Sequence, residues 1–267
     1  MTSLTLLTFV LAAVSTLVSA APLTQADLNS TIWTPEHVLQ MHEVILYGDD
    51  GRMEVVHESV YHRLLESQGV TIGRPETTIT DPNSDTALPQ AVKANDTSLP
   101  KRYNSCADNV ISVQDGIQTF VDWDVQMSPV VIGAGAGGID VCVSSGYTVS
   151  NSFSVGGGAG YLALKQTVEA SVHIDYSKTW TTQTVVNVKA TVPVGWSGCM
   201  ITKPTVTRRH GREFWGCLGS MTPHGTWQAD SHTEGTYAGV KWVRGAITLC
   251  AKKQYPLSRC EGAGHFI

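Results

Sequence analysis

Beyond residue 20 the chain has no apolar run long enough to span a bilayer as a helix. It also lacks the short motifs of several enzyme classes, with no G-x-S-x-G, no H-E-x-x-H and no carboxylate pair of the glycosidase kind. No C-x-x-C is present, and no Cys/His set has the spacing of a zinc site. The sequence therefore predicts no metal, no cofactor and no catalytic residue.

The first 20 residues have the layout of a secretory signal peptide. Their apolar run ends in the small residues Val18-Ser19-Ala20, although the usual positive charge at the start is missing. A membrane anchor is the alternative, but no basic flank follows the run. We expect a secreted, extracellular protein.

Residues 21–102 contain no cysteine, whereas all six cysteines lie further along the chain. Lys101-Arg102 stands at this change of composition and resembles the cleavage site of a kexin-type processing protease; the alternative is an accidental basic pair. The sequence thus predicts three parts: a signal peptide (1–20), a propeptide (21–102) and a mature domain (103–267).

Charge follows the same division. Residues 21–102 carry six Lys and Arg against twelve Asp and Glu, a net charge of −6, and residues 1–20 carry none. Because the whole chain carries −5, residues 103–267 carry about +1. A nearly neutral mature domain gives no net-charge argument for binding nucleic acid or an anionic membrane.

The predicted propeptide is partly helical and largely flexible. The stretches 34–48 and 53–69 could each form a short amphipathic helix, and 75–100 has the composition of a flexible linker. Asn29 and Asn95 begin glycosylation sequons. Four histidines in this part are interpreted as belonging to solvated helix faces: His37, His42, His57 and His62.

An even number of widely spaced cysteines in a secreted chain predicts disulfides. The six are Cys106, Cys142, Cys199, Cys217, Cys250 and Cys260. Their pairing stays open, with Cys250–Cys260 plausible as a local loop and Cys106 as a staple for the start of the domain. If all are paired, no free thiol is available as a nucleophile or ligand.

The mature domain shows the period-2 alternation of half-buried strands rather than helical periodicity. Clear examples are 147–155, 168–176 and 181–192. In "FVDWDVQ", alternation would expose Asp122 and Asp124 and bury Trp123. Glycine clusters supply turns, and one solvated sheet face is typical of antiparallel sheets. We predict an all-β, antiparallel, sandwich-like domain.

The segment "VVIGAGAGG" (130–138) contains G-x-G-x-x-G, the fingerprint of a dinucleotide-binding loop. That fingerprint requires a helix after the glycines, with its N-terminus at the pyrophosphate. Here a β-branched run begins at Ile139 instead. We expect a glycine-rich turn between two strands and no nucleotide.

The segment "KPTVTRRHGR" and the tryptophans that follow it form the candidate binding surface: Lys203, Arg208, Arg209, His210, Arg212, Trp215 and Trp227. Clustered cations could contact phosphate, sulfated sugar or acidic lipid, and tryptophans suit glycan or protein interfaces. A solvated loop is the alternative. A ribonuclease-like set of His210, Arg212 and Glu213 can be drawn here, but one patch does not make an active site.

A second candidate lies at "ADSH", where Asp230 and His232 would share one face of a strand, continued by Glu234. Such a trio could bind a metal or act as acid and base, but a polar strand edge is the simpler interpretation. His173 and Asp175 repeat the arrangement. A hydrolase or nuclease therefore stays open as an alternative.

The Ser/Thr-rich block 144–191, with "SNSFSVGGG" and "SKTWTTQTVVNV", resembles in texture the central region of aerolysin-type β-pore-forming proteins. Long hairpins with one polar face can re-form as a transmembrane barrel. This resemblance implies a membrane-active toxin as a second hypothesis.

A broader resemblance covers nearly all of residues 103–267. It rests on "TFVDWDVQMSP", "SSGYTVSNS", "IDYSKTWTTQT", "MITKPTVTRRHGR", "GCLGS", "TWQADSHTEGTY" and "PLSRCEGAGHFI". Together these resemble secreted fungal effector-like proteins of the Celp type. The resemblance implies a virulence-associated extracellular protein that binds a host or microbial surface component, and it transfers no site residues.

Overall fold

The computed structural model describes residues 29–47, 52–76, 110–144, 146–157, 161–182, 186–217, 220–237 and 240–267. The expected signal peptide, Lys101-Arg102, Asn95 and Cys106 lie outside these residues. Asn29 is exposed at the start of the described chain. Within the described residues the protein is mostly β, as the sequence predicts, and none of the helices has the length and apolar character needed to cross a membrane.

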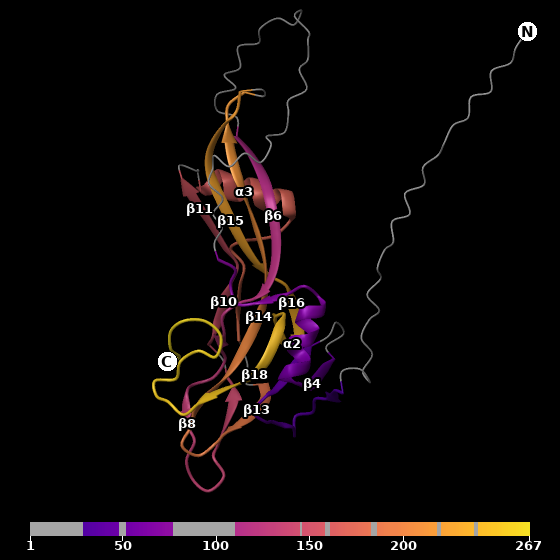
Figure 1. Cartoon of the computed structure of the whole chain (residues 1–267), viewed down its shortest axis with the longest axis vertical. Helices are drawn as coiled ribbons and strands as arrows, with labels where there is room; N and C mark the ends of the chain where they lie inside the picture. The colour runs from indigo at the N-terminus through magenta and orange to yellow at the C-terminus, as the bar shows by residue number, and fades with distance from the viewer. Residues whose placement is uncertain are drawn as a thin grey trace, which may run out of the picture.

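One long strand, β14 (Ser197–Trp215), organises the molecule. Its first half pairs with β18 (Gly245–Lys252), and its second half lies between β15 (Thr222–His232) and β6 (Val110–Val121). Figure 1 shows that β14 therefore runs through both halves of an elongated molecule. The remaining members of this sheet are β1 (Thr31–Ile32), β3 (Glu43–Tyr47), β4 (Met53–His57), β5 (Thr71–Ile72), β7 (Val125–Gln126), β8 (Val131–Ile132) and β11 (Ser152–Gly157).

Three smaller sheets complete the β structure. They are β2–β13–β9 (Val38–Leu39, Val186–Val192, Ile139–Val143), β10–β12 (Thr148–Ser150, Thr179–Thr181) and β16–β17 (Glu234–Tyr237, Val240–Val243). The largest core lies where β9 and β13 pack against the long sheet, with Val141 and Val188 beside Met200 and Ile247. In the other half of the molecule, helix α3 (Tyr161–Val172) covers one face of β11 and β15 (Figure 1).

Four strands from the described residues before 77 are built into this sheet: β1, β3, β4 and β5. Strand β3 is hydrogen-bonded between β4 and β18, with Ile45 opposite Ile247. Helix α2 (Glu58–Ser67) packs Tyr61 and Leu65 against Val121 of β6. The helix expected at 34–48 is wrong, because the described residues of this stretch contain the strands β2 and β3 and no helix. The stretch 53–69 divides into β4 and α2, so the prediction of a helix there is correct only for its second half.

The alternation predicted within 181–192 is confirmed for its last part, since β13 buries Val188, Ala190 and Val192. Residues 183–185 of that stretch lie outside the described residues. The strand expected at 168–176 is wrong: α3 occupies most of it. Leu164, Val168 and Val172 recur every four residues and contact one core cluster, which is the spacing of a helix face. The helix begins at Tyr161, before the predicted strand at 168–176, so its period of four is not visible within that stretch alone.

The glycine-rich turn is confirmed. Strand β8 ends at Ile132, a turn follows, and β9 begins at Ile139 without a helix. A Cβ on Gly133 would lie 1.9 Å from the carbonyl oxygen of Pro193, so only glycine fits there. Gly138 has a φ of 90°, which glycine adopts without strain.

The cysteines follow the prediction only in part. Cys250–Cys260 forms the expected local disulfide, and Cys217 is also disulfide-bonded. The prediction is wrong for Cys142 and Cys199, which are free thiols, the first exposed and the second buried. Cys199 lies opposite Cys250 in the β14–β18 register, but Cys250 is already bonded to Cys260.

Candidate functional site

Three of the five basic residues expected on one surface are buried in separate ion pairs. Arg208 and Arg212 are 6% and 3% exposed, and Lys203 is 3% exposed. Each has a carboxylate partner: Asp230 at 2.8 Å, Asp115 at 2.8 Å and Glu58 at 2.9 Å respectively. Strand β14 is hydrogen-bonded along both edges, so side chains of its neighbouring strands flank its own on each face of the sheet. A cation buried there requires a partner.

The other members of the predicted surface are also dispersed. Arg209 reaches Ser231 at 3.4 Å on the opposite face from Arg208. Trp227 is 4% exposed and stacks on Phe153 under α3. Trp215 is partly exposed and stacks on His224, with 3.8 Å between ring centroids. His210 and Glu213 are three positions apart in β14 and face opposite sides of the sheet, so the ribonuclease-like set does not assemble.

A cavity of about 370 Å³ lies where β6 leads into β7, beside β10, β11, β14 and β15. It falls in the size range of small-ligand sites. Its lining includes three arginines, three aspartates and one histidine: Arg74, Arg208, Arg259, Asp122, Asp124, Asp230 and His232. We regard this charged cavity as the candidate functional site.

Arg74 enters the cavity from the upstream segment, by which we mean the described residues before 77 (29–47 and 52–76). Its guanidinium donates two hydrogen bonds to the Asp122 carboxylate, one of them 3.0 Å long from Nη2 to Oδ2. It also lies 4.5 Å from the ring centroid of Trp123, in a cation–π contact. The hydrogen bond to Asp122 raises the pKa of Arg74, with a further contribution from the charge of Asp230. The arrangement recognises both the fork and the flat face of a guanidinium.

Arg208 and Asp230 form a second bidentate pair on the cavity wall, with both bonds at 2.8 Å. The Arg208 guanidinium also lies 4.9 Å from the Phe120 ring centroid and donates to the carbonyl oxygen of Pro75 at 3.4 Å. Pro75, the residue after Arg74, therefore contacts the same wall of the cavity. Because Asp230 is committed to Arg208, it does not pair with His232 as the sequence suggested.

His232 lines the same cavity. Its main-chain N–H donates to Asn151 Oδ1 at 2.8 Å, whereas its buried Nε2 has no hydrogen-bond partner among the described residues. Burial lowers the pKa of His232, helped by the charge of Arg74 and opposed by Asp122 and Asp230. Glu234, the third member of the predicted trio, instead pairs with Lys178 at 2.8 Å.

Asp124 is the most deeply buried carboxylate of the cavity, at 1% exposure. Its Oδ2 accepts a hydrogen bond from the Glu261 N–H at 2.7 Å, while Oδ1 is buried without a partner among the described residues. Burial raises its pKa to about 6. The predicted exposure of Asp122 and Asp124 is wrong: the chain between β6 and β7 is not a strand there and turns both acids inward.

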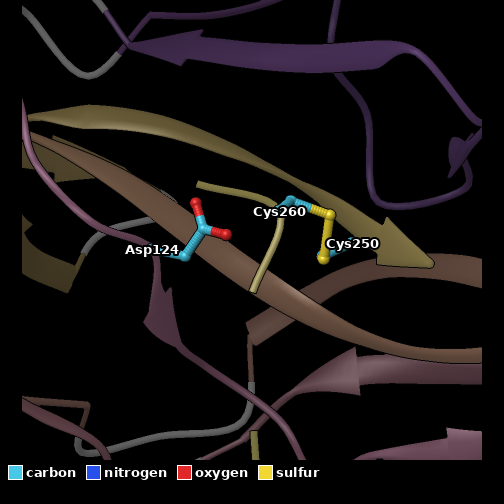
Figure 2. A group of neighbouring side chains, drawn as sticks. All are labelled: Asp124, Cys250 and Cys260. Atoms are coloured by element: carbon cyan, nitrogen blue, oxygen red, sulfur yellow. A yellow bond between two sulfur atoms is a disulfide. The ribbon is translucent and has the colours of Figure 1, made fainter. Parts of the chain in front are cut away.

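The Asp124 carboxylate lies beside Cys250 and Cys260 (Figure 2). Three such side chains have the donor atoms of a metal site, but both sulfurs are joined in the disulfide. Thiolates are the form in which cysteine binds metals, so this group offers one carboxylate and no thiolate. The expectation of no metal site is not tested by this arrangement.

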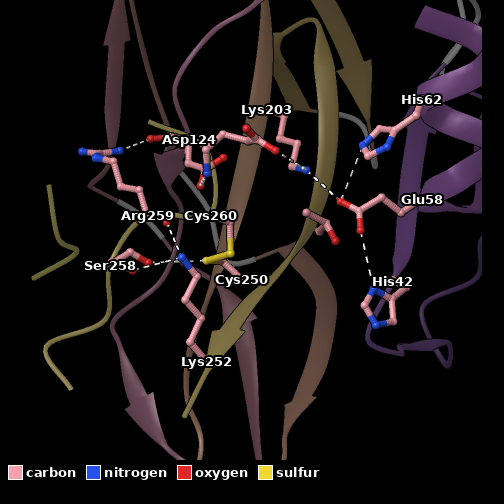
Figure 3. Close-up of polar contacts among 12 residues, drawn as sticks. His42, Glu58, His62, Asp124, Lys203, Cys250, Lys252, Ser258, Arg259 and Cys260 are labelled. Carbon is pink, nitrogen blue, oxygen red and sulfur yellow. Dashed lines mark hydrogen bonds and ion pairs between the residues drawn. A yellow bond between two sulfur atoms is a disulfide. The ribbon is translucent and has the colours of Figure 1, made fainter. Parts of the chain in front are cut away.

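A second charged network joins the upstream segment to β14 (Figure 3). Glu58 contacts Lys203 at 2.9 Å, His42 at 3.6 Å and His62 at 3.9 Å, and Lys203 also lies 3.7 Å from Glu261. Burial acts to raise the pKa of Glu58, but Lys203 and the two histidines outweigh it and lower the pKa. Both histidines are exposed, as predicted, but only His62 lies on a helix, because His42 is in the turn before β3.

The other candidate residues lie away from both networks. His173 is exposed just after α3, and the Asp175 carboxylate accepts from the Ser177 N–H at 2.7 Å. The described part of block 144–191 is not one long hairpin, since α3 separates β11 from β12.

No protein-family model, curated protein or solved structure matches the chain.

Proposed function

We propose that the chain is the pro-form of a secreted effector-like binding protein. In this proposal a kexin-type protease cuts after Arg102, residues 21–102 are the propeptide, and residues 103–267 form a disulfide-stabilised, sandwich-like module. The module binds a host or microbial surface component through the charged cavity rather than through the surface at Lys203–Arg212. The observation that carries this proposal is the position of Arg74, which lies upstream of the predicted cut and inside the cavity.

Covering of the mature domain by the upstream segment supports the proposal. Strand β3 occupies the edge of β18, and α2 packs over Val121 and Ala246. An unpaired strand edge and an apolar patch are features that bind other chains, so a cover would hold them until processing. A cut at Arg102 would leave this cover docked by strand pairing. Binding therefore requires dissociation as well as cleavage.

Lys203 and Glu58 offer one way to promote that dissociation. The lowered pKa of Glu58 means that its ion pair stabilises the docked segment at neutral pH and is lost as the carboxylate is protonated below about pH 4.5. Mild acid after cleavage is thus the appropriate treatment for separating the two parts.

The test compares three preparations of the protein: uncut, cut with a kexin-type protease, and cut then separated by size exclusion at pH 4 and returned to pH 7. Intact mass defines the new N-terminus, and labelled protein is applied to fungal, bacterial and plant cells. We expect a cut after Arg102 and cell binding only by the separated module. Equal binding by the uncut chain, or no binding to any of the three cell types, would refute the proposal.

A hydrolase remains a second candidate because two groups of opposite acid–base character line one cavity, each with a buried atom that has no hydrogen-bond partner in the described part of the chain. The pKa of Asp124 is raised to about 6 and that of His232 is lowered, which suits general acid–base chemistry. RNA and glycan degradation should be assayed with the separated module and with its His232→Gln variant. Turnover by the parent and not by the variant would favour the hydrolase over a binding protein.

A further inference from the structure

We propose that the charged cavity is a guanidinium-binding site, and that Arg74 occupies the position taken after processing by an arginine side chain of a partner peptide. This inference rests on the proposed function, because it names the ligand class of the same site. It predicts a chemical selectivity that cleavage and cell binding do not themselves require.

The Asp122–Trp123 pair is the recognition element. The two carboxylate oxygens of Asp122 accept both bonds of the Arg74 fork, and the Trp123 ring lies against the flat face of the guanidinium. A lysine ammonium is a point charge and cannot make both contacts at once. The site is therefore shaped for arginine rather than for positive charge in general.

The charges of the cavity favour a cation once Arg74 is removed. Arg208 is held by Asp230, and Arg259 donates to the main-chain oxygen of Asp124 while stacking on Phe266. Asp122 would then lose its side-chain cation. Asp124 also lines the cavity, and it adds a second carboxylate whose Oδ1 is buried without a hydrogen-bond partner among the described residues.

Arg74 is an exchangeable occupant. Its side chain is 46% exposed, whereas that of Asp122 is 12% exposed. Because the Arg74 side chain is half-exposed, solvent screens its charge and limits what the ion pair contributes to stability. The cavity is also larger than one guanidinium group, at about 370 Å³ with Arg74 forming part of its wall, so flanking peptide atoms have room.

The test uses the full chain with Arg74→Ala, which opens the site without cleavage. The probes are acetyl-Gly-Arg-Gly-amide, its citrulline analogue, which has the same shape without charge, and its lysine analogue. Binding is titrated by ligand-observed NMR at pH 7. We expect the variant to bind the arginine peptide at least about tenfold more tightly than either analogue, as the loss of one charge-assisted bond would produce.

Three controls accompany this variant. Uncut wild type and Arg52→Ala should bind none of the peptides, because Arg52 belongs to the upstream segment but pairs with Glu54 and does not line the cavity. Arg74→Ala combined with Asp122→Asn should lose the selectivity. Arg74→Gln, which keeps most of the packing on Trp123, replaces Arg74→Ala if thermal unfolding shows that the alanine variant is misfolded.

The outcomes separate this inference from the proposed function. Equal binding of arginine and citrulline peptides by the Arg74 variant, or equal binding by wild type, overturns the guanidinium site. Selective binding by the variant, without any gain when wild type is cut and separated, supports the site and removes the release step. Cell binding by the separated module without arginine selectivity supports the release step and removes the guanidinium site.

Discussion

Lys203 of β14 and Glu58 at the start of α2 form an ion pair at 2.9 Å although 145 positions separate them in the chain. Lys203 is almost fully buried, so its charge requires a partner. The partner that approaches most closely belongs to the upstream segment. This contact couples the stability of β14 and its sheet to the segment that contains α2.

Replacing Glu58 should weaken that coupling. We expect Glu58→Gln to lower the free energy of unfolding of the full chain by about 1–2 kcal/mol, because Lys203 keeps only the more distant Glu261. Urea unfolding at pH 7 measures the change. Glu66→Gln, an exposed position on the same helix, should stay within about 0.5 kcal/mol of wild type. Equal effects of the two substitutions would contradict a specific role for Glu58.

Asp124 should make the protein less stable as the pH rises from about 4 to about 6. Its pKa is about 6 in the folded chain against an ordinary value of 3.8, so the folded state binds the proton more tightly than the unfolded state does. The expected loss is about 2–3 kcal/mol across this range. Urea midpoints measured from pH 4 to 7 should show the decline in wild type and a flatter profile in Asp124→Asn. The exposed Asp140→Asn should leave the wild-type decline intact.

The two free thiols should react at very different rates. Cys142 is exposed, whereas burial raises the pKa of Cys199 to about 12. Because the thiolate is the reactive form, we expect Cys199 to be alkylated on the order of 100-fold more slowly than Cys142. Mass spectrometry after iodoacetamide treatment, without reductant, counts the modified sites. Absence of label from both cysteines in protein unfolded without reductant would contradict the two free thiols.

Gly211 should tolerate no side chain. A Cβ there would lie 2.0 Å from the carbonyl oxygen of Val113 and 2.8 Å from the Trp227 ring. We expect Gly211→Ala to cost about 3 kcal/mol or more, since both neighbours are held in the sheet. Gly137→Ala is the matched control, because no atom lies within 4 Å of the added carbon. Similar melting temperatures for the two variants would show that the strands can separate at Gly211.

Local sequence patterns correctly predicted the elements whose burial in the fold follows the same pattern. The glycine turn before Ile139 and the alternation of β13 were both recognised because positive φ and period-2 burial are properties of the chain itself. The apolar sequence of β3 was assigned to a helix because a central strand buries adjacent residues on both faces. Val44 and Ile45 are both fully buried, in two different cores.

The candidate site was predicted only in fragments. Asp230, His232 and Arg208 were each singled out, but as two separate sites. Arg74 carries no local signal, because its partner Asp122 is 48 positions away and becomes a neighbour only through the parallel pairing of β5 with β6. No spacing rule could have joined them.

The sequence by itself determined that the chain is rich in strands and turns at its glycines, because these depend on short-range geometry. It made a Cys250–Cys260 loop plausible but left the pairing open, and the structure shows that disulfide. The tertiary structure decided which charges face solvent and which are buried in pairs. That outcome depends on strand order and register: β14 places Arg208 beside Asp230, and β5 carries Arg74 to Asp122. A buried charge is stable only where such pairing supplies its counter-ion, and pairing is a property of the whole fold.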